Sequence, residues 1–458
     1  MGLTKVIEHV FRRLLPSPFT IAVLLTLLTL VLALVFTENT ADKNHLFTIL
    51  SHWEDGIWNN GLLVFAYQMM LILVLGHVLV LSKPMEYLIL RITGLVTNAS
   101  NAAVLVALSA MLVSFFNWGL GLIFGAILAR KVGEHAKSRD IPINYPLIGA
   151  CGYSGLMVWH GGISGSAPIK VSEAGHLKEL LKNVSNPEML AKLPDAISTS
   201  LTIFTPWNLI LFVLVVLSIT ALVYFLSKRT KATTIDLKTY EFRSMDKKDL
   251  KGAEKLDHSK MMAIFFGVLI LVVFLLQYLP ALRTLNITPN MLNFFMLGLA
   301  IVLHGSFRNF LMAVEEAISD TAGILIQFPL YFGIIGIMAG SGMINAISDF
   351  FVSISSTTTL PIYTFLSAGL VNIFVPSGGG QWAVQGPLVV ESALQLGVSL
   401  PKSVMALAYG DQITNMLQPF WALPLLGITK LKAKEILPYT LLFMLLGSAI
   451  FMMGLLVF

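Results

Sequence analysis

The chain has 458 residues, of which 56% are hydrophobic and only 12% charged, and its formal net charge is +5. Soluble domains carry roughly 25% charged residues, so this chain has too few charges to cover a soluble surface, and lipid is its expected solvent. The basic residues lie in short stretches between apolar segments, which argues against nucleic acid as a partner. The single cysteine, Cys151, excludes a disulfide framework.

The first apolar run, residues 20–36, follows Arg12 and Arg13 and so resembles a signal peptide. It is longer than the hydrophobic region of a cleaved signal, and no small-x-small cleavage pattern follows it. We therefore expect an uncleaved first membrane helix in a multi-pass protein of the bacterial inner membrane, with a cytoplasmic N-terminus.

Further apolar runs predict the remaining membrane spans, since a full span needs roughly 20 apolar residues. The expected spans are 20–37, 61–82, 143–168, 200–227, 262–280, 291–305, 322–343, 401–427 and 436–458.

Two apolar stretches, 101–136 and 358–398, do not resemble single spans. Each is long enough for two half-length helices and has helix-breaking residues at its centre, SFFNWGLG at 114–121 and NIFVPSGGGQ at 372–381. Irregular backbone is tolerated at membrane depth only where protein buries it or where it lines a cavity. We therefore predict two re-entrant hairpins with polar tips near the bilayer midplane.

The distribution of basic residues supports the first hairpin, because cytoplasmic loops attract Lys and Arg. With the N-terminus inside, a hairpin keeps the next basic cluster inside, whereas a single span would place it outside: Arg130, Lys131, Lys137 and Arg139. The same count places the loop 228–260 and the lysines at 430, 432 and 434 inside. It places the acidic loop around Glu38, Asp42, Glu54 and Asp55 outside. The loop 169–199 falls outside despite four lysines and is the exception.

The two halves of the chain repeat this arrangement in opposite orientation. We predict a first repeat over 1–227 with hairpin 101–136, a cytoplasmic loop and connector helix over 228–290, and an inverted second repeat over 291–458 with hairpin 358–398. Inverted repeats with broken helices are typical of secondary transporters, which bind substrate where the repeats meet. The expected fold class is an all-α polytopic membrane protein, an inverted-repeat transporter with two re-entrant hairpins and broken helices.

The tip of the second hairpin is the leading candidate for substrate binding. Its residues are Ser377, Gly378, Gly379, Gly380 and Gln381. Glycines let backbone N–H groups approach a ligand closely, and the helix that starts here would direct its positive end at a carboxylate. The alternative is close helix packing or a kink.

Polar residues also interrupt the first hairpin and two spans. Asn117 can offer its carbonyl to a cation or its amide to a carboxylate, or can be the polar neighbour of an interfacial tryptophan. Small polar residues within the broken spans suit a desolvated Na+, which prefers oxygen ligands. From these segments we predict substrate contacts at Ser154, His160 and Asn415. We predict coupling-ion ligands at Asn117, Gly155, Asn372, Asp411 and Thr414.

Asp411 and His160 are the titratable candidates. An ionisable residue at membrane depth is functional by default, and Asp411 can bind Na+, carry a proton or accept hydrogen bonds that hold an unwound segment. His160 can relay a proton, or can be a hydrogen-bonded structural residue at a helix break. No metal motif of the CxxC or HExxH kind occurs, and we expect no cofactor besides a coupling ion.

Three long motifs resemble the short-chain fatty acid transporter family, whose bacterial members include acetoacetate and butyrate permeases. They are NIFVPSGGGQWAVQGP at 372–387, FFNWGLGLIFGAILAR at 115–130 and YGDQITNMLQPFWALPLLG at 409–427. The family is placed in the ion transporter superfamily. The resemblance implies an inverted-repeat, elevator-type transporter with two opposed hairpins, in which a transport domain slides against a scaffold, and it implies a homodimer. Relatives with known sites carry Ser-Asn-Thr at both tips, whereas this chain has Asn-Trp-Gly at 117–119 and Pro-Ser-Gly-Gly-Gly at 376–380.

Together these features predict a symporter of short monocarboxylates such as acetoacetate or butyrate, driven by Na+ or H+. Alternatives within transport are another small organic anion, such as a dicarboxylate or an amino acid, or Na+/H+ exchange. An intramembrane enzyme with His160 and Asp411 as its acid–base pair is a different class, against which the repeat argues. A channel would need a continuous polar pore.

Overall fold

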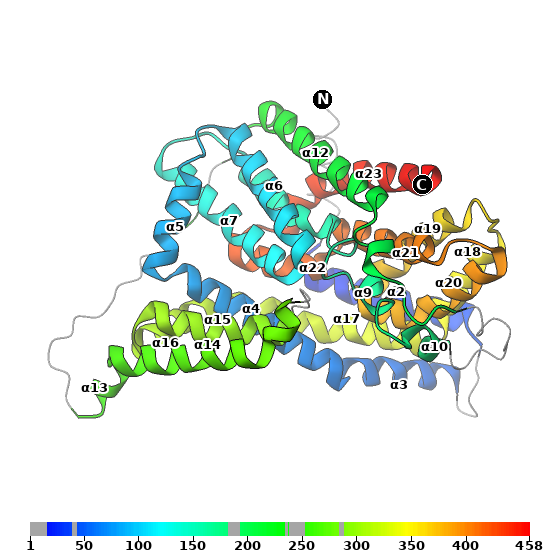
Figure 1. Cartoon of the computed structure of the whole chain (residues 1–458), viewed down its shortest axis with the longest axis horizontal. Helices are drawn as coiled ribbons and strands as arrows, with labels where there is room; N and C mark the ends of the chain where they lie inside the picture. Colours follow the sequence, from blue (N-terminus) through cyan, green and yellow to red (C-terminus); the bar gives the residue numbers. More distant parts are fainter. Residues whose placement is uncertain (1–15, 39–43, 182–192, 234–236, 238–251, 284–287) are drawn as a thin grey trace.

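The computed structural model describes residues 16–38, 44–181, 193–233, 237, 252–283 and 288–458. Across these ranges the secondary structure consists of α-helices and short 3-10 helices, without strands (Figure 1). Seven of the described helical segments are long and apolar enough to cross a membrane. The prediction of an all-α polytopic membrane protein is therefore confirmed. The basic residues before position 16 and most of the predicted loop 228–260 lie outside the described residues.

The first half of the chain contains α2 (Pro18–Phe36), α3 (His45–Ile57), α4 (Asn60–Val80), α5 (Lys83–Thr93), α6 (Ala99–Phe116), α7 (Trp118–Ser138), α8 (Tyr145–Tyr153), η1 (Ser154–Met157), α9 (Ser166–Lys170), α10 (His176–Leu180), η2 (Thr199–Leu201) and α12 (Pro206–Arg229).

The rest contains α13 (Glu254–Asp257), α14 (Lys260–Arg283), α15 (Pro289–His304), α16 (Phe307–Ala317), η3 (Ile318–Thr321), α17 (Ala322–Gly340), α18 (Met343–Ser353), α19 (Leu360–Phe374), α20 (Gly378–Leu396), α21 (Leu400–Thr414), η4 (Asn415–Leu417), α22 (Pro419–Thr429) and α23 (Ala433–Val457).

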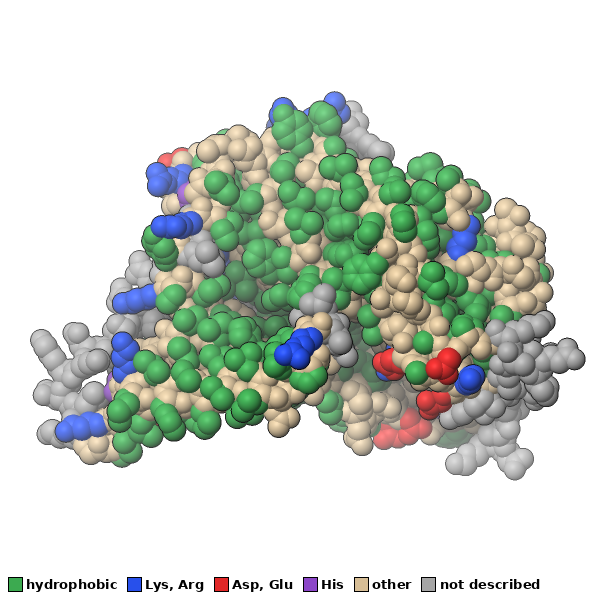
Figure 2. All heavy atoms as spheres, viewed as in Figure 1, with side chains coloured by type: hydrophobic (Ala, Val, Ile, Leu, Met, Phe, Trp, Pro, Cys, Tyr) green, Lys and Arg blue, Asp and Glu red, His purple; other side chains and the backbone are tan. Residues whose placement is uncertain are grey.

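The helices form two layers in the view of Figure 1. The lower layer holds α3, α4 and α14 to α17, and α2 packs on α17. The upper layer holds α6, α7, α12 and α19 to α23. Hydrophobic side chains cover much of the visible face of both layers, while Lys and Arg side chains gather at the left end and acidic ones at the lower right (Figure 2). Such an apolar surface with charges at its ends suits contact with lipid.

Both predicted hairpins are present as helix pairs that fold back on themselves. In the first, Gly121 of α7 lies against Ser114 of α6, and Gly125 lies against Ala110. A β-carbon added at Gly121 would lie 1.9 Å from Ser114 Oγ, so only glycine allows this approach. In the second, the side-chain amide of Gln381 on α20 donates to the carbonyl of Ala368 on α19 at 2.9 Å. Their re-entrant placement in a bilayer stays a prediction.

The two halves have the same order of helices, and the first helices of each half pack against the other half. The sequence α2–α3–α4–α5–α6–α7 corresponds to α15–α16–α17–α18–α19–α20, and a broken helix follows each. Reciprocally, α2 and α3 pack on α17, while α15 and α16 pack on α4. Such reciprocal packing is expected when two related halves are arranged about a pseudo-two-fold axis.

Two short helices occupy segments that we did not expect to be helical. The stretch around Glu54 and Asp55, predicted as an acidic loop, contains α3, and α16 follows α15. Gly56 of α3 crosses α17 at Gly336, where an added β-carbon would lie 2.9 Å from the Cα of Gly336. Both helices are too short to register as spans, so counting 20-residue apolar runs overlooks them.

Candidate functional site

Each hairpin breaks at a residue that also caps the next helix. Asn117 is the single extended residue between α6 and α7, and its Oδ1 accepts the N–H of Leu120 at 2.9 Å. In the second hairpin, residues 375–377 separate the helices, and Ser377 Oγ accepts the N–H of Gly380 at 3.2 Å. The first N–H groups of a helix have no intrahelical acceptor and carry a partial positive charge. Each break therefore presents a helix end that favours anions.

Both helix ends open on one cavity. A cavity of about 300 Å³ is lined by Trp118 at the start of α7, by Gly379 in the first turn of α20, and by the loop residues 163–166. The backbone N–H of Trp118 donates to Ser164 Oγ at 2.9 Å, and this hydrogen bond holds the loop against the first hairpin. Gly379 faces Ser166, whose Oγ would lie 3.9 Å from an added β-carbon. The cavity thus combines hydroxyls, two helix N-termini and indole surface.

The outer rim of this cavity is formed by α9, α10 and α20. Lys170, His176 and Trp382 line it, and Trp382 Nε1 donates to His176 Nε2 at 2.9 Å. Lys170 pairs with Glu173 at 3.0 Å, and both side chains are about half exposed. Partial burial, followed by the neighbouring Lys170 charge, holds the pKa of His176 below its ordinary value of 6.5. His176 is therefore neutral at pH 7, as its role as acceptor requires.

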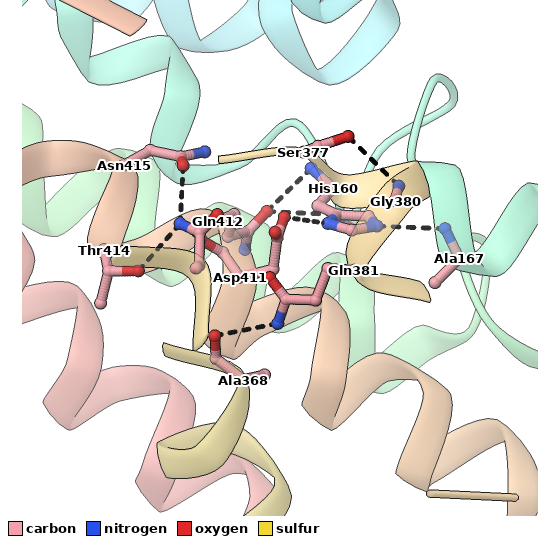
Figure 3. Close-up of polar contacts among 12 residues, drawn as sticks. His160, Ala167, Ala368, Ser377, Gly380, Gln381, Asp411, Gln412, Thr414 and Asn415 are labelled. Atoms are coloured by element: carbon pink, nitrogen blue, oxygen red, sulfur yellow. Dashed lines mark hydrogen bonds and ion pairs between the residues drawn. The ribbon is translucent and has the colours of Figure 1, made fainter. Parts of the chain in front are cut away.

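Behind the second tip, His160 and Asp411 form a buried pair that joins the two broken spans (Figure 3). His160 Nε2 accepts the backbone N–H of Ala167 at 3.0 Å. Nδ1 must then carry the ring proton, which it donates to Asp411 Oδ2. Gly378 packs against this pair, since an added β-carbon would lie 2.9 Å from His160 Cε1. In this conformation the imidazole is neutral and both its nitrogens are engaged.

A second cluster surrounds the side chain of Asn372, directly before the second tip, and includes Thr414 and Asn415, which are labelled in Figure 3. Its Nδ2 lies 2.6 Å from Asp411 O, 2.9 Å from Thr414 Oγ1 and 2.8 Å from Asn415 Oδ1. An amide nitrogen has two hydrogens, so three oxygens exceed what it can satisfy. A turn of the amide that brings Oδ1 toward these atoms would present four oxygens to a cation.

Several buried polar atoms around these clusters have no hydrogen-bond partner. They are Asn372 Oδ1, Asp411 Oδ1, Gln412 Nε2, Asn415 Nδ2 and Gln418 Oε1. Buried polar groups are nearly always satisfied, and an unsatisfied group calls for a bound ion, water or ligand. Their concentration at the α21–η4 break therefore points to a ligand there.

The other predicted residues lie nearby but have structural contacts. Ser154 Oγ donates to Cys151 O at 2.7 Å, and Gly155 packs on Ser114 of α6. Gln381 is fully buried and directs its amide toward α19, away from the cavity. Thus Asn372, Asp411, Thr414 and Asn415 come together at one site, whereas Asn117 belongs to the first hairpin and Gly155, in η1, packs against that hairpin.

Sequence reasoning missed Gln412 and the loop after His160. Gln412 Oε1 accepts the N–H groups of His160 at 2.9 Å and Gly161 at 3.1 Å, and so holds the first broken span against the second. Ser164 was visible as one of several small polar residues between glycines, but nothing in that pattern indicated that it faces the cavity.

The chain resembles known proteins along its whole length. A family model described as short chain fatty acid transporter matches residues 2–458. A relative from Escherichia coli (strain K12) is 36% identical over 97% of both chains. One from Haemophilus influenzae is 35% identical over 96% of both. Both relatives are named as candidate short-chain fatty acid transporters.

Two solved structures are more distantly similar. The crystal structure of the Alcanivorax borkumensis YdaH transporter has a TM-score of 0.42 and 16% identity, over 96% of this chain and 98% of that one. The structure of Neisseria gonorrhoeae MtrF has a TM-score of 0.39 and 14% identity, over 98% of this chain and 97% of that one. The matches to the family model and to these two relatives, by contrast, extend over almost the whole chain. The chain belongs to the short-chain fatty acid transporter family.

Proposed function

We propose that this protein is a symporter that carries a short monocarboxylate, such as acetoacetate or butyrate, together with Na+ or H+. The observation that supports it best is the meeting of two helix N-termini at one cavity of about 300 Å³. Helix ends stabilise a carboxylate without a buried counter-charge. The indole rings of Trp118 and Trp382 offer apolar surface for a short alkyl chain.

In this proposal the carboxylate binds Ser164, Ser166 and the N–H groups at Gly378 and Gly379. The coupling cation binds the oxygens of Asp411, Thr414 and Asn415, with Asn372 turned to contribute its own. A neutral His160 holds one carboxylate oxygen of Asp411 and leaves the other for the ion. Coupling follows because the cation site and the substrate site share the second hairpin, so occupation of one orders the other.

The uptake of labelled butyrate and acetoacetate into proteoliposomes tests this function. An imposed Na+ gradient is compared with an imposed pH gradient, and succinate and alanine serve as competitors. Accumulation against a concentration gradient under one of the two conditions would support symport and identify the ion. A folded protein that accumulates neither monocarboxylate under either gradient would refute the substrate assignment. Competition by succinate alone would favour a dicarboxylate carrier.

We further propose an elevator-type motion in which the upper layer slides against the lower. Helix α5 connects α4 of the lower layer to α6 of the upper layer, and α18 connects α17 to α19 in the same way, as expected for hinged connectors. A pair of cysteines at Gly323 of α17 and Leu423 of α22 can be joined by a short thiol-reactive crosslinker, because an added β-carbon at Gly323 lies 3.4 Å from Leu423 Cδ2. Crosslinking this pair should stop uptake reversibly.

The matched control joins two residues of the lower layer, Gln68 and Asn290, whose side chains are 2.8 Å apart and exposed. Crosslinking that pair should leave uptake unchanged. Equal uptake with both pairs crosslinked would contradict a sliding motion. The bacterial inner-membrane location, the cytoplasmic N-terminus and the homodimer remain part of the proposal.

A further inference from the structure

A basic cavity of about 610 Å³ lies away from the hairpin tips, between the two layers. Lys430, Lys432 and Lys434 line one side of it, between the end of α22 and the start of α23. Pro18 of α2 and Gly323 of α17 line the other side. Residues far apart in the sequence thus enclose a positively charged space.

The backbone adds to this positive charge. Helices α2 and α23 both begin at the cavity, and the N-terminal end of each carries a partial positive charge, while the C-terminal end of α22 contributes a partial negative one. Lys430 adopts a left-handed conformation with φ 58°, which is uncommon for a residue with a side chain. The acidic group nearest in the chain is Glu435, whose carboxylate accepts the Lys432 N–H at 2.7 Å. In the described part of the chain, neither Lys432 nor Lys434 forms an ion pair.

An apolar groove of about 430 Å³ lies next to this cavity, and Pro16 lines both. The groove follows α2 past Ile21, Leu24 and Leu28. It ends at Tyr331, Thr414 and Gln418, beside the α21–η4 break. A basic cavity and an apolar groove along α2 thus lie side by side and meet at Pro16.

We propose that this two-part space is a binding site for one anionic phospholipid. The phosphate binds at Lys430, Lys432 and Lys434, and an acyl chain occupies the groove along α2. Basic pockets between membrane helices on the cytoplasmic side characteristically hold anionic head groups. A soluble anion would use the lysines but would leave the apolar groove unexplained. Because the groove is lined by both layers, the lipid lies in the interface across which they contact each other.

Native mass spectrometry of the purified full-length protein tests the site. The protein is equilibrated with an equimolar mixture of phosphatidylglycerol and phosphatidylethanolamine that have identical acyl chains. We expect wild type to retain phosphatidylglycerol at least several-fold more often than phosphatidylethanolamine. The triple variant Lys430→Gln, Lys432→Gln, Lys434→Gln should lose this preference.

A matched triple variant, Lys231→Gln, Lys255→Gln, Lys260→Gln, removes the same charge from exposed positions elsewhere and should keep the preference. Leu24→Trp fills the groove without changing the charge and should also release the lipid. A separate competition with glycerol phosphate and inorganic phosphate distinguishes a lipid from a free anion. Displacement of the lipid at equal concentration by either would overturn the lipid assignment, as would equal retention by wild type and the first triple variant.

Discussion

His160 on the first broken span donates its Nδ1 proton to Asp411 on the second, and the bond joins residues 251 positions apart in the sequence. The pair is buried, and Gly378 of the second hairpin tip packs on it. One contact therefore connects both halves of the chain to the tip that we assign to substrate binding. Asp411 Oδ1 is buried without a hydrogen-bond partner, so one oxygen of this carboxylate is engaged and the other is not.

The first prediction concerns this carboxylate. Asp411→Asn keeps the shape of the side chain but removes its charge. A hydrogen bond to a charged group contributes about 1.5–3 kcal/mol, so we expect butyrate uptake to fall by roughly tenfold or more. Proteoliposome uptake at several concentrations of the coupling ion measures the effect. Glu391→Gln, whose exposed carboxylate contacts Gln395, is the control and should behave like wild type. Unchanged uptake and ion dependence in Asp411→Asn would contradict a role in coupling.

The second prediction concerns the close packing of the hairpin tip. A β-carbon at Gly378 would lie 2.7 Å from the Trp159 ring and 2.9 Å from His160 Cε1, closer than real contacts allow. We expect Gly378→Ala to displace the tip and to abolish most uptake, while the protein still inserts and folds. Gly61→Ala meets only the Asn59 side chain at 3.4 Å and should keep full activity. Equal uptake by these two variants, at equal amounts of folded protein, would show that the tip does not need this contact.

The third prediction concerns the oxygen cluster around Asn372. Thr414→Val removes one oxygen and keeps the side-chain volume nearly constant. We expect the half-saturating concentration of the coupling ion to rise by roughly tenfold, the equivalent of about 1.4 kcal/mol. Thr220→Val on α12 also removes a buried hydroxyl, but one without a partner, and should leave ion dependence unchanged. If the half-saturating concentration of the substrate rose while that of the ion stayed unchanged, Thr414 would belong to the substrate site and not to the ion site.

Much of the architecture was predictable because it depends on local chemistry. The breaks at Asn117 and at residues 375–377 follow from residues that end helices, and the structure places both as expected. Asn372, Asp411 and Asn415 were candidates because they are polar residues in apolar segments, and in the structure they are in contact with one another. The pairing of His160 with Asp411 was not predictable, because it depends on how two halves of the chain pack. For the same reason, the position of α10 and His176 at the rim of the cavity could not be predicted.

The last prediction concerns that cover and its dependence on pH. Trp382 donates to His176 Nε2, which requires a neutral imidazole, and burial together with Lys170 lowers the pKa of His176. A histidine whose folded pKa is lowered binds fewer protons in the folded state than in the unfolded state, so stability rises with pH in this range. The contribution of His176 to stability should be complete above the ordinary value of 6.5 and should disappear as the pH falls through the lowered pKa.

His176→Ala should therefore lower the melting temperature by a few degrees at pH 7.5, and the difference from wild type should shrink at pH 5. His258→Ala, at the half-buried residue that follows α13, is the matched control and should show no such pH-dependent difference. If the His176→Ala difference stayed constant between the two pH values, the hydrogen bond to Trp382 would not be what fixes α10 over the cavity.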